Sequence, residues 1–156
     1  MNLTPHMETI LTAVLADVRR LEAVPDRPPP GVDWDRWRDL WRERKEYDQF
    51  GVHHDLAQWL GHPPSPSESA VFSRALRNME EIGLVVRVSR WGGGRATHVC
   101  LTPLGRTEAE RLVADQDTAM AALLKDLAPL VESLGQAAPE SPQNADNSLD
   151  SPSPLR

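Results

Sequence analysis

The side chains best suited to chemistry in this sequence are serines and arginines at helical spacing within residues 67–77. Arg74 and Arg77 are three residues apart, so on a helix they share one face. A guanidinium fork matches O6 and N7 of guanine, and a good bidentate pair discriminates by about 1–3 kcal/mol, so Arg74 and Arg77 are expected to contact bases or nearby phosphates. Serines more often bind phosphates and set the register of the protein on the duplex. The pattern predicts a helix that reads the major groove of DNA. Its predicted DNA-contacting residues are Ser67, Ser69, Ser73, Arg74 and Arg77.

A second group of basic side chains surrounds the glycine run 92–94. Residues 84–89 are rich in β-branched side chains and residues 96–101 alternate, which together predict a β-hairpin with the glycines at its tip. Arg90 and Arg95 flank that tip, with Trp91 between them. Arginines suit a narrow, electronegative minor groove, so these three residues complete the predicted DNA site. Two interpretations of Trp91 remain open: packing on the base of the hairpin, or contact with sugar and backbone.

The helix that carries Arg74 and Arg77 has well-defined ends. Ser65 is a good N-cap, a proline follows it at the first helical position, and Glu68 completes a capping box. Gly83 supplies the left-handed stop. The face opposite the arginines carries an apolar stripe at spacings of four and three residues, made by Phe72, Leu76 and Met79.

The order of helix, glycine stop, strand, arginine-flanked glycine turn and second strand is similar to that of a winged helix-turn-helix. The phrases SRALRNMEEIGLVVRV and VCLTPLGR resemble those of MarR-type and PadR-type bacterial transcription regulators, over about residues 52–111. The resemblance implies a regulator that binds double-stranded DNA, usually as a homodimer, in the bacterial cytoplasm. A short helix over 52–60 and the helix over 66–82 would be the helix-turn-helix pair.

Composition limits the function. The chain has 156 residues and a net charge of −6, yet residues 71–106 hold six Arg and only two Glu. This modest basic patch permits DNA binding and predicts weak non-specific affinity. One cysteine excludes an internal disulfide framework and a cysteine-based zinc site. The sequence shows no signal peptide and no membrane-spanning run, which predicts a cytoplasmic protein that does not enter the membrane.

The predicted fold class is α+β and mainly helical: a winged helix-turn-helix core with a two-stranded wing and helical arms at both ends. Prolines and turn residues place the boundaries. The expected divisions are a helical arm over 1–24, a proline-rich linker over 25–33, the winged-helix domain over 34–111, a C-terminal helix over 112–135 and a disordered tail over 136–156.

Two apolar stripes lie in the predicted arms, and both are candidates for a dimer interface. The N-terminal stripe, at spacings of three and four, either forms part of that interface or packs on its own domain; it is made by Leu11, Val14, Val18 and Leu21. The C-terminal stripe has the spacing of a short heptad repeat and is made by Met120, Leu123, Leu127 and Leu130. It either forms a dimer interface or packs on the N-terminal helix. Pro129 should kink or split this helix.

Three indoles at spacings of three and four lie on the helix predicted for 34–50: Trp34, Trp37 and Trp41. Their size predicts burial in a core or an interface, and an aromatic ligand pocket is the alternative. His53 and His54 are adjacent, so on a helix they cannot form a same-face metal pair. We expect no metal, no cofactor and no enzyme activity, because no nucleophile–base pair or carboxylate dyad is evident.

The sequence therefore predicts a dimeric, sequence-specific DNA-binding regulator. Two alternatives remain: a winged-helix adaptor that contacts another protein, and a regulator that responds to a small-molecule effector in a tryptophan-lined pocket.

Overall fold

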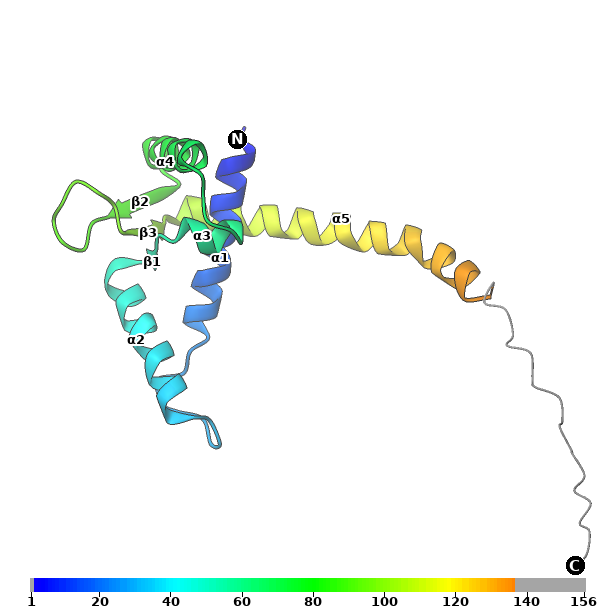
Figure 1. Cartoon of the computed structure of the whole chain (residues 1–156), viewed down its shortest axis with the longest axis horizontal. Coiled ribbons are helices and arrows are strands. Elements are labelled where there is room, and N and C mark those ends of the chain that lie inside the picture. The colour runs from blue at the N-terminus through cyan, green and yellow to red at the C-terminus, as the bar shows by residue number, and fades with distance from the viewer. Residues whose placement is uncertain (1, 137–156) are drawn as a thin grey trace, which may run out of the picture. The chain divides into compact units, whose positions relative to one another are not determined.

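The computed structural model describes residues 2–136 of the chain, which divides into two compact units, Met1–Thr118 and Ala119–Arg156. The protein is mainly helical, with one small antiparallel sheet (Figure 1). None of the described helices is long and apolar enough to cross a membrane. The elements in chain order are α1 (Pro5–Glu22), α2 (Trp34–Phe50), β1 (Val52–His53), α3 (Leu56–Leu60), α4 (Pro66–Glu81), β2 (Val85–Val88), β3 (His98–Leu101) and α5 (Pro103–Gln136).

The core of the first unit is built around α1. Its buried side chains pack against α4, β1 and β3 and against the first turns of α5. The four residues of the N-terminal stripe, which are at most 4% exposed, belong to this buried set: Leu11, Val14, Val18 and Leu21. Their assignment to a dimer interface is therefore corrected, because this face of α1 is already covered by the same chain.

The boundary predicted between an N-terminal arm and the domain is also corrected. The proline-rich linker does not separate α1 from the rest; it joins α1 to α2, and the two helices pack together. Arg44 of α2 donates to the carbonyl oxygens of Leu21 and Glu22 at 3.1 Å each. Glu22 also accepts from the Tyr47 hydroxyl at 3.1 Å and from both Nη atoms of Arg106, at 2.9 and 3.0 Å. The end of α1 is thus tied to α2 and to the start of α5.

The sheet has the strand order β1-β3-β2, with both pairs antiparallel. The hairpin of β2 and β3 confirms the predicted strands, with Val86 opposite Cys100 and Val88 opposite His98. The third strand, β1, was predicted as the start of a helix over 52–60. Val52 and His53 instead pair with β3, and the helix α3 is confined to Leu56–Leu60.

Gly51 explains why the chain leaves α2 and enters β1 at this point. Its φ is +92°, a backbone conformation that glycine adopts without strain. A Cβ atom at this position would lie 2.7 Å from the Val99 carbonyl oxygen and would overlap Cys100 Sγ. The closeness of β3 therefore requires a residue without a side chain.

The C-terminal helix is one continuous element, and Pro129 does not split it. Its last part, from Ala119, belongs to the second unit. Residues 137–156, which hold nearly all of the tail predicted to be disordered, lie outside the described residues.

Candidate nucleic-acid interface

The helix α4 begins with the capping box that the sequence predicts. Ser65 Oγ accepts from the Glu68 backbone N–H at 3.2 Å, and the Ser65 backbone N–H donates to Glu68 Oε2 at 2.8 Å. That N–H, the Ser65 hydroxyl and then His62 lower the pKa of Glu68 to about 2. The cap fixes the start of α4 and therefore the direction in which its outer face points.

The outer face of α4 presents the predicted DNA-contacting side chains to solvent. Phe72, Leu76 and Met79 are buried, as the stripe predicts. Ser69 is half-buried, and four of the five predicted residues are exposed: Ser67, Ser73, Arg74 and Arg77. Arg74 and Arg77 make no ion pair with any described carboxylate.

Most other arginines of the chain are neutralised by a carboxylate. Arg20 contacts Glu43 at 2.8 Å, and Arg106 contacts Glu22 at 2.9 Å. The arginines in ion pairs are Arg20, Arg38, Arg42, Arg44, Arg87, Arg90, Arg106 and Arg111. Arg74 and Arg77 on the outer face of α4 thus belong to the smaller group of exposed arginines without a described ion pair, which also includes Arg19, Arg27, Arg36 and Arg95.

At the hairpin tip (residues 89–97), Arg90 does not have the role that its position suggests. Its Nη1 atom contacts Glu46 Oε1 of α2 at 2.7 Å. Its guanidinium also lies over the rings of Phe50 and Trp91, at 5.6 and 5.0 Å from their centroids. Because Glu46 also contacts the buried His98 at 3.0 Å, the carboxylate that holds Arg90 is itself anchored. Arg90 therefore links the hairpin to α2.

The other two tip residues are open to solvent. Arg95 is exposed and makes no ion pair with a described carboxylate. Trp91 is 79% exposed, so the interpretation that it packs on the base of the hairpin is corrected. Its only described ring partner is the Arg90 guanidinium. Of the predicted tip residues, Arg95 carries free charge and Trp91 carries free aromatic surface.

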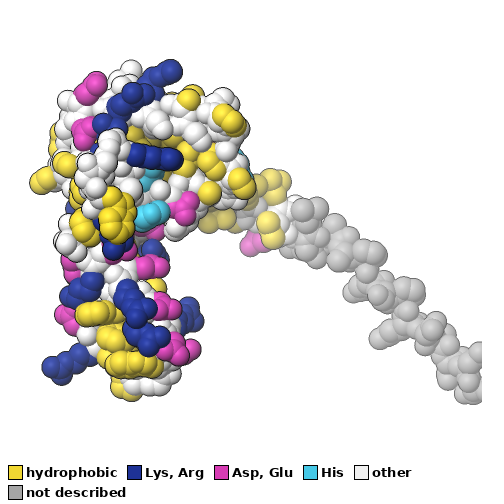
Figure 2. All heavy atoms as spheres, turned by 60° about the vertical axis from the view of Figure 1, so that its left-hand side comes forward, with side chains coloured by type: hydrophobic (Ala, Val, Ile, Leu, Met, Phe, Trp, Pro, Cys, Tyr) yellow, Lys and Arg dark blue, Asp and Glu magenta, His cyan; other side chains and the backbone are white. Residues whose placement is uncertain are grey.

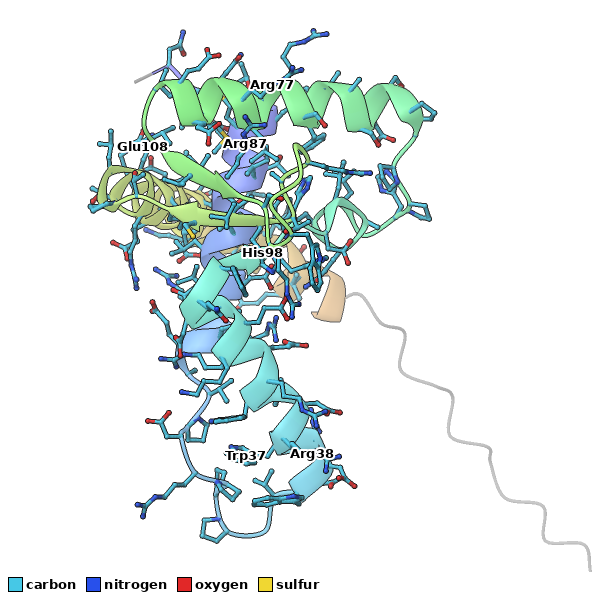
Figure 3. The ribbon with its side chains drawn as sticks, turned by 90° about the vertical axis from the view of Figure 1, so that its left-hand side faces the viewer. Trp37, Arg38, Arg77, Arg87, His98 and Glu108 are labelled. Atoms are coloured by element: carbon cyan, nitrogen blue, oxygen red, sulfur yellow. The ribbon has the colours of Figure 1, made fainter. Side chains whose placement is uncertain are left out.

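A groove of about 390 Å³ separates α4 from the hairpin, and we call it the α4–hairpin groove. Arg77 of α4 and Arg87 of β2 lie on the same side of the molecule, one above the other (Figure 3). The groove is lined by His54, Ser73, Leu76, Arg77, Arg87, Gly94, Arg95, Ala96 and Val99. Three predicted DNA-contacting residues, Ser73, Arg77 and Arg95, therefore meet at one place.

Two residues of this groove were not foreseen. Arg87 is held by Glu80 of α4 through two contacts of 2.7 Å, and its backbone N–H donates to Glu80 at 3.0 Å. These bonds, the backbone one first, lower the pKa of Glu80. His54 lies between β1 and α3, and its Nε2 is buried without a hydrogen-bond partner among the described residues. Strand alternation could have placed Arg87 here, whereas no sequence signal points to His54.

The three tryptophans of α2 do not form one pocket. Trp37 is buried and donates to the Pro25 carbonyl oxygen at 3.2 Å, but Trp34 is 57% exposed and Trp41 is only half-buried. A groove of about 540 Å³ at this end of α2 is lined by Trp37, Leu40 and the proline-rich segment, not by the other two indoles. Common burial in the chain's own core is therefore wrong, and no one groove is lined by all three indoles, whereas burial in an interface with another molecule stays a prediction. Figure 2 shows hydrophobic side chains gathered at this end of the molecule, among basic ones.

The C-terminal stripe is exposed in the single chain. Its exposed apolar side chains, between 44% and 67% accessible, are Met120, Leu123, Leu124, Leu127, Leu130 and Val131. The predicted stripe has two apolar residues in every seven, and the exposed Leu124 and Val131 raise this to three in every seven. A stripe of this width is typical of a helix that packs in a bundle.

Comparison with protein-family models, curated proteins and solved structures gives no match to this chain. The residues of the chain itself are therefore the basis for assigning a function.

Proposed function

We propose that this protein is a winged helix-turn-helix transcription regulator that binds double-stranded DNA as a homodimer. Helix α4 would lie in the major groove, and the hairpin of β2 and β3 would be the wing beside it. The chain would act through binding alone, with no catalytic step.

The observation that carries this proposal is the uncompensated charge of Arg74, Arg77 and Arg95. These side chains are exposed and free of described ion pairs, in a protein that pairs most of its arginines. A phosphate backbone gains most from cations that no carboxylate already neutralises, because binding then releases counterions. The apolar face of α4 is buried, so its basic face is the one that a ligand can reach.

The proposed dimer would form through α5. The apolar stripe of α1 is used inside the chain, whereas the stripe from Met120 to Val131 has no partner among the described residues. Six exposed apolar side chains on one helix face favour burial against a second copy. A two-fold pair of α4 helices would read half-sites about 34–36 Å apart, so the operator would be a pseudo-palindrome.

A direct test compares the full-length protein with Arg74→Ala/Arg77→Ala in binding to fluorescent duplexes made from genomic fragments. The matched control is Arg38→Ala/Arg42→Ala, which removes two exposed arginines from α2 that already pair with Asp35 and Asp39. We expect the α4 variant to lose binding and the α2 variant to retain it. Equal loss in both would leave only general electrostatics. No binding by the unaltered protein would favour the adaptor alternative, in which α4 contacts another protein.

A further inference from the structure

The α4–hairpin groove has the charge of an anion site. Its lining includes three arginines and no carboxylate. Arg87 is neutralised and held in place by Glu80, whereas Arg77 and Arg95 approach from α4 and from the hairpin tip without a described carboxylate partner. Figure 2 shows a basic side chain lying across a hollow of this face, with a histidine beside it.

The donors available in the groove fit a tetrahedral oxyanion. A guanidinium presents up to five N–H donors in a fixed fork, which matches two oxygens of a phosphate at once. Ser73 adds a hydroxyl from the same wall as Arg77. Because the two free arginines come from different elements, one bound group would join α4 to the hairpin.

We propose that this groove is a phosphate-binding site in which Arg77 and Arg95 hold one phosphate group between α4 and the hairpin, with Ser73 as an additional donor. The assignment rests on the proposed function in one respect: there the phosphate belongs to the backbone of a DNA duplex. A free phosphate ion has the same chemistry, so the test separates the two sources.

His54 supplies a local readout. Burial, followed by the positive charges of His53 and Arg95, lowers the pKa of His54, and Asp55 opposes this in part. The Trp59 ring lies 5.1 Å from the imidazole, and the buried Nε2 atom has no hydrogen-bond partner among the described residues. An anion in the groove would offset the nearby positive charge and favour the imidazolium. Phosphate binding should therefore raise the pKa of His54 and take up a proton.

The test is an NMR pH titration of the histidines in the full-length protein, with the His54 signal assigned from His54→Gln. Inorganic phosphate is one ligand and a short duplex is the other, each against sodium chloride at equal ionic strength. We expect both ligands to raise the His54 midpoint relative to chloride. Arg77→Gln or Arg95→Gln should raise the phosphate concentration needed for half-saturation roughly tenfold. Arg90→Gln, on the same tip but already paired with Glu46, should leave it unchanged.

Duplex binding is followed by anisotropy in the same samples, so failure of the site and failure of the proposed function can be told apart. A bound duplex with an unmoved His54 midpoint would overturn the groove site and leave DNA binding intact. A shift with inorganic phosphate but no duplex binding would support the site with a free phosphate ligand and contradict the DNA-binding function. A shift that survives in Arg77→Gln and Arg95→Gln would overturn the site as assigned.

Discussion

Arg90 and Arg95 flank the same glycine turn, yet the structure predicts that they contribute differently to the salt dependence of DNA binding. Arg95 is free of described carboxylates, whereas Arg90 is neutralised by Glu46 at 2.7 Å. Each phosphate neutralised by a protein cation adds about 0.9 to the slope of log K against log salt concentration. Because the Arg90–Glu46 pair has no net charge, it should add little. The perturbation is Arg95→Gln, with Arg90→Gln as its matched control.

The magnitude follows from the free arginines. Arg74, Arg77 and Arg95 in two protomers give a slope of about −5, so affinity should fall roughly a thousandfold between 50 and 200 mM salt. Arg95→Gln removes two cations from a dimer and should reduce the slope by about 1.8. Arg90→Gln should change it by less than about 0.5, because Arg90 is held by Glu46 and is not available to neutralise a phosphate.

The assay is fluorescence anisotropy of one duplex at four or more salt concentrations, with all variants checked for an unchanged melting temperature. A slope reduction in Arg90→Gln as large as that in Arg95→Gln would refute the reasoning, because it would mean that DNA takes Arg90 away from Glu46. An unchanged slope in Arg95→Gln would also refute the reasoning, because it would mean that Arg95 neutralises no phosphate.

Three further predictions concern the fold and the assembly. Gly105→Ala should lower the free energy of unfolding, measured with urea, by about 1–3 kcal/mol, because its Cβ would lie 2.8 Å from the Leu84 carbonyl carbon. Gly93→Ala is the control and should be neutral, because the space around Gly93 is open. The depressed pKa of Glu68 stabilises the fold above its usual titration range, so the stability difference between the unaltered protein and Glu68→Gln should disappear as pH falls from about 4.5 toward 2; an unchanged difference across that range would contradict it. Leu127→Asp should convert the proposed dimer to monomer in sedimentation equilibrium, while Ala122→Asp on the opposite face of α5 should not. A dimer that survives Leu127→Asp would contradict the proposed interface on α5.

Local signals in the sequence were enough to predict α4 and the hairpin. A capping box, a proline at the first helical position and a glycine stop depend on neighbours within a few residues, and so does strand alternation. Val52 and His53 could not be recognised in this way, because a two-residue strand has no period and is defined by its partner β3.

The role of each face was harder to predict than its position. The α1 stripe was visible in the sequence, but periodicity shows that a face is buried and not which chain buries it. Similarly, Arg90 and Arg95 look equivalent beside the glycine turn. Only the fold brings Glu46, 44 residues away, to one of them. Asp17 is a third residue whose role depends on partners distant in sequence. Its carboxylate accepts hydrogen bonds from the side chains of Gln58 and Trp59 at 3.4 and 3.2 Å.

The exposed tryptophan end of α2 belongs to none of these predictions. Trp34 stacks at 5.2 Å from Trp37, and Lys45 lies 5.3 Å from the centre of the Trp41 ring. A row of stacked tryptophans that is partly open to solvent suits contact with another molecule. This exposed aromatic surface is consistent with the adaptor alternative, in which the chain contacts another protein.

The central claim is sequence-specific reading of duplex DNA by α4, and selection from random-sequence duplexes followed by sequencing tests it most directly. The full-length protein would be run beside Arg74→Ala/Arg77→Ala at two salt concentrations. We predict enrichment of a two-fold motif, with half-sites about 10–10.5 base pairs apart, that the variant loses. Retention without any motif, abolished by the higher salt, would contradict the claim and leave only background electrostatics.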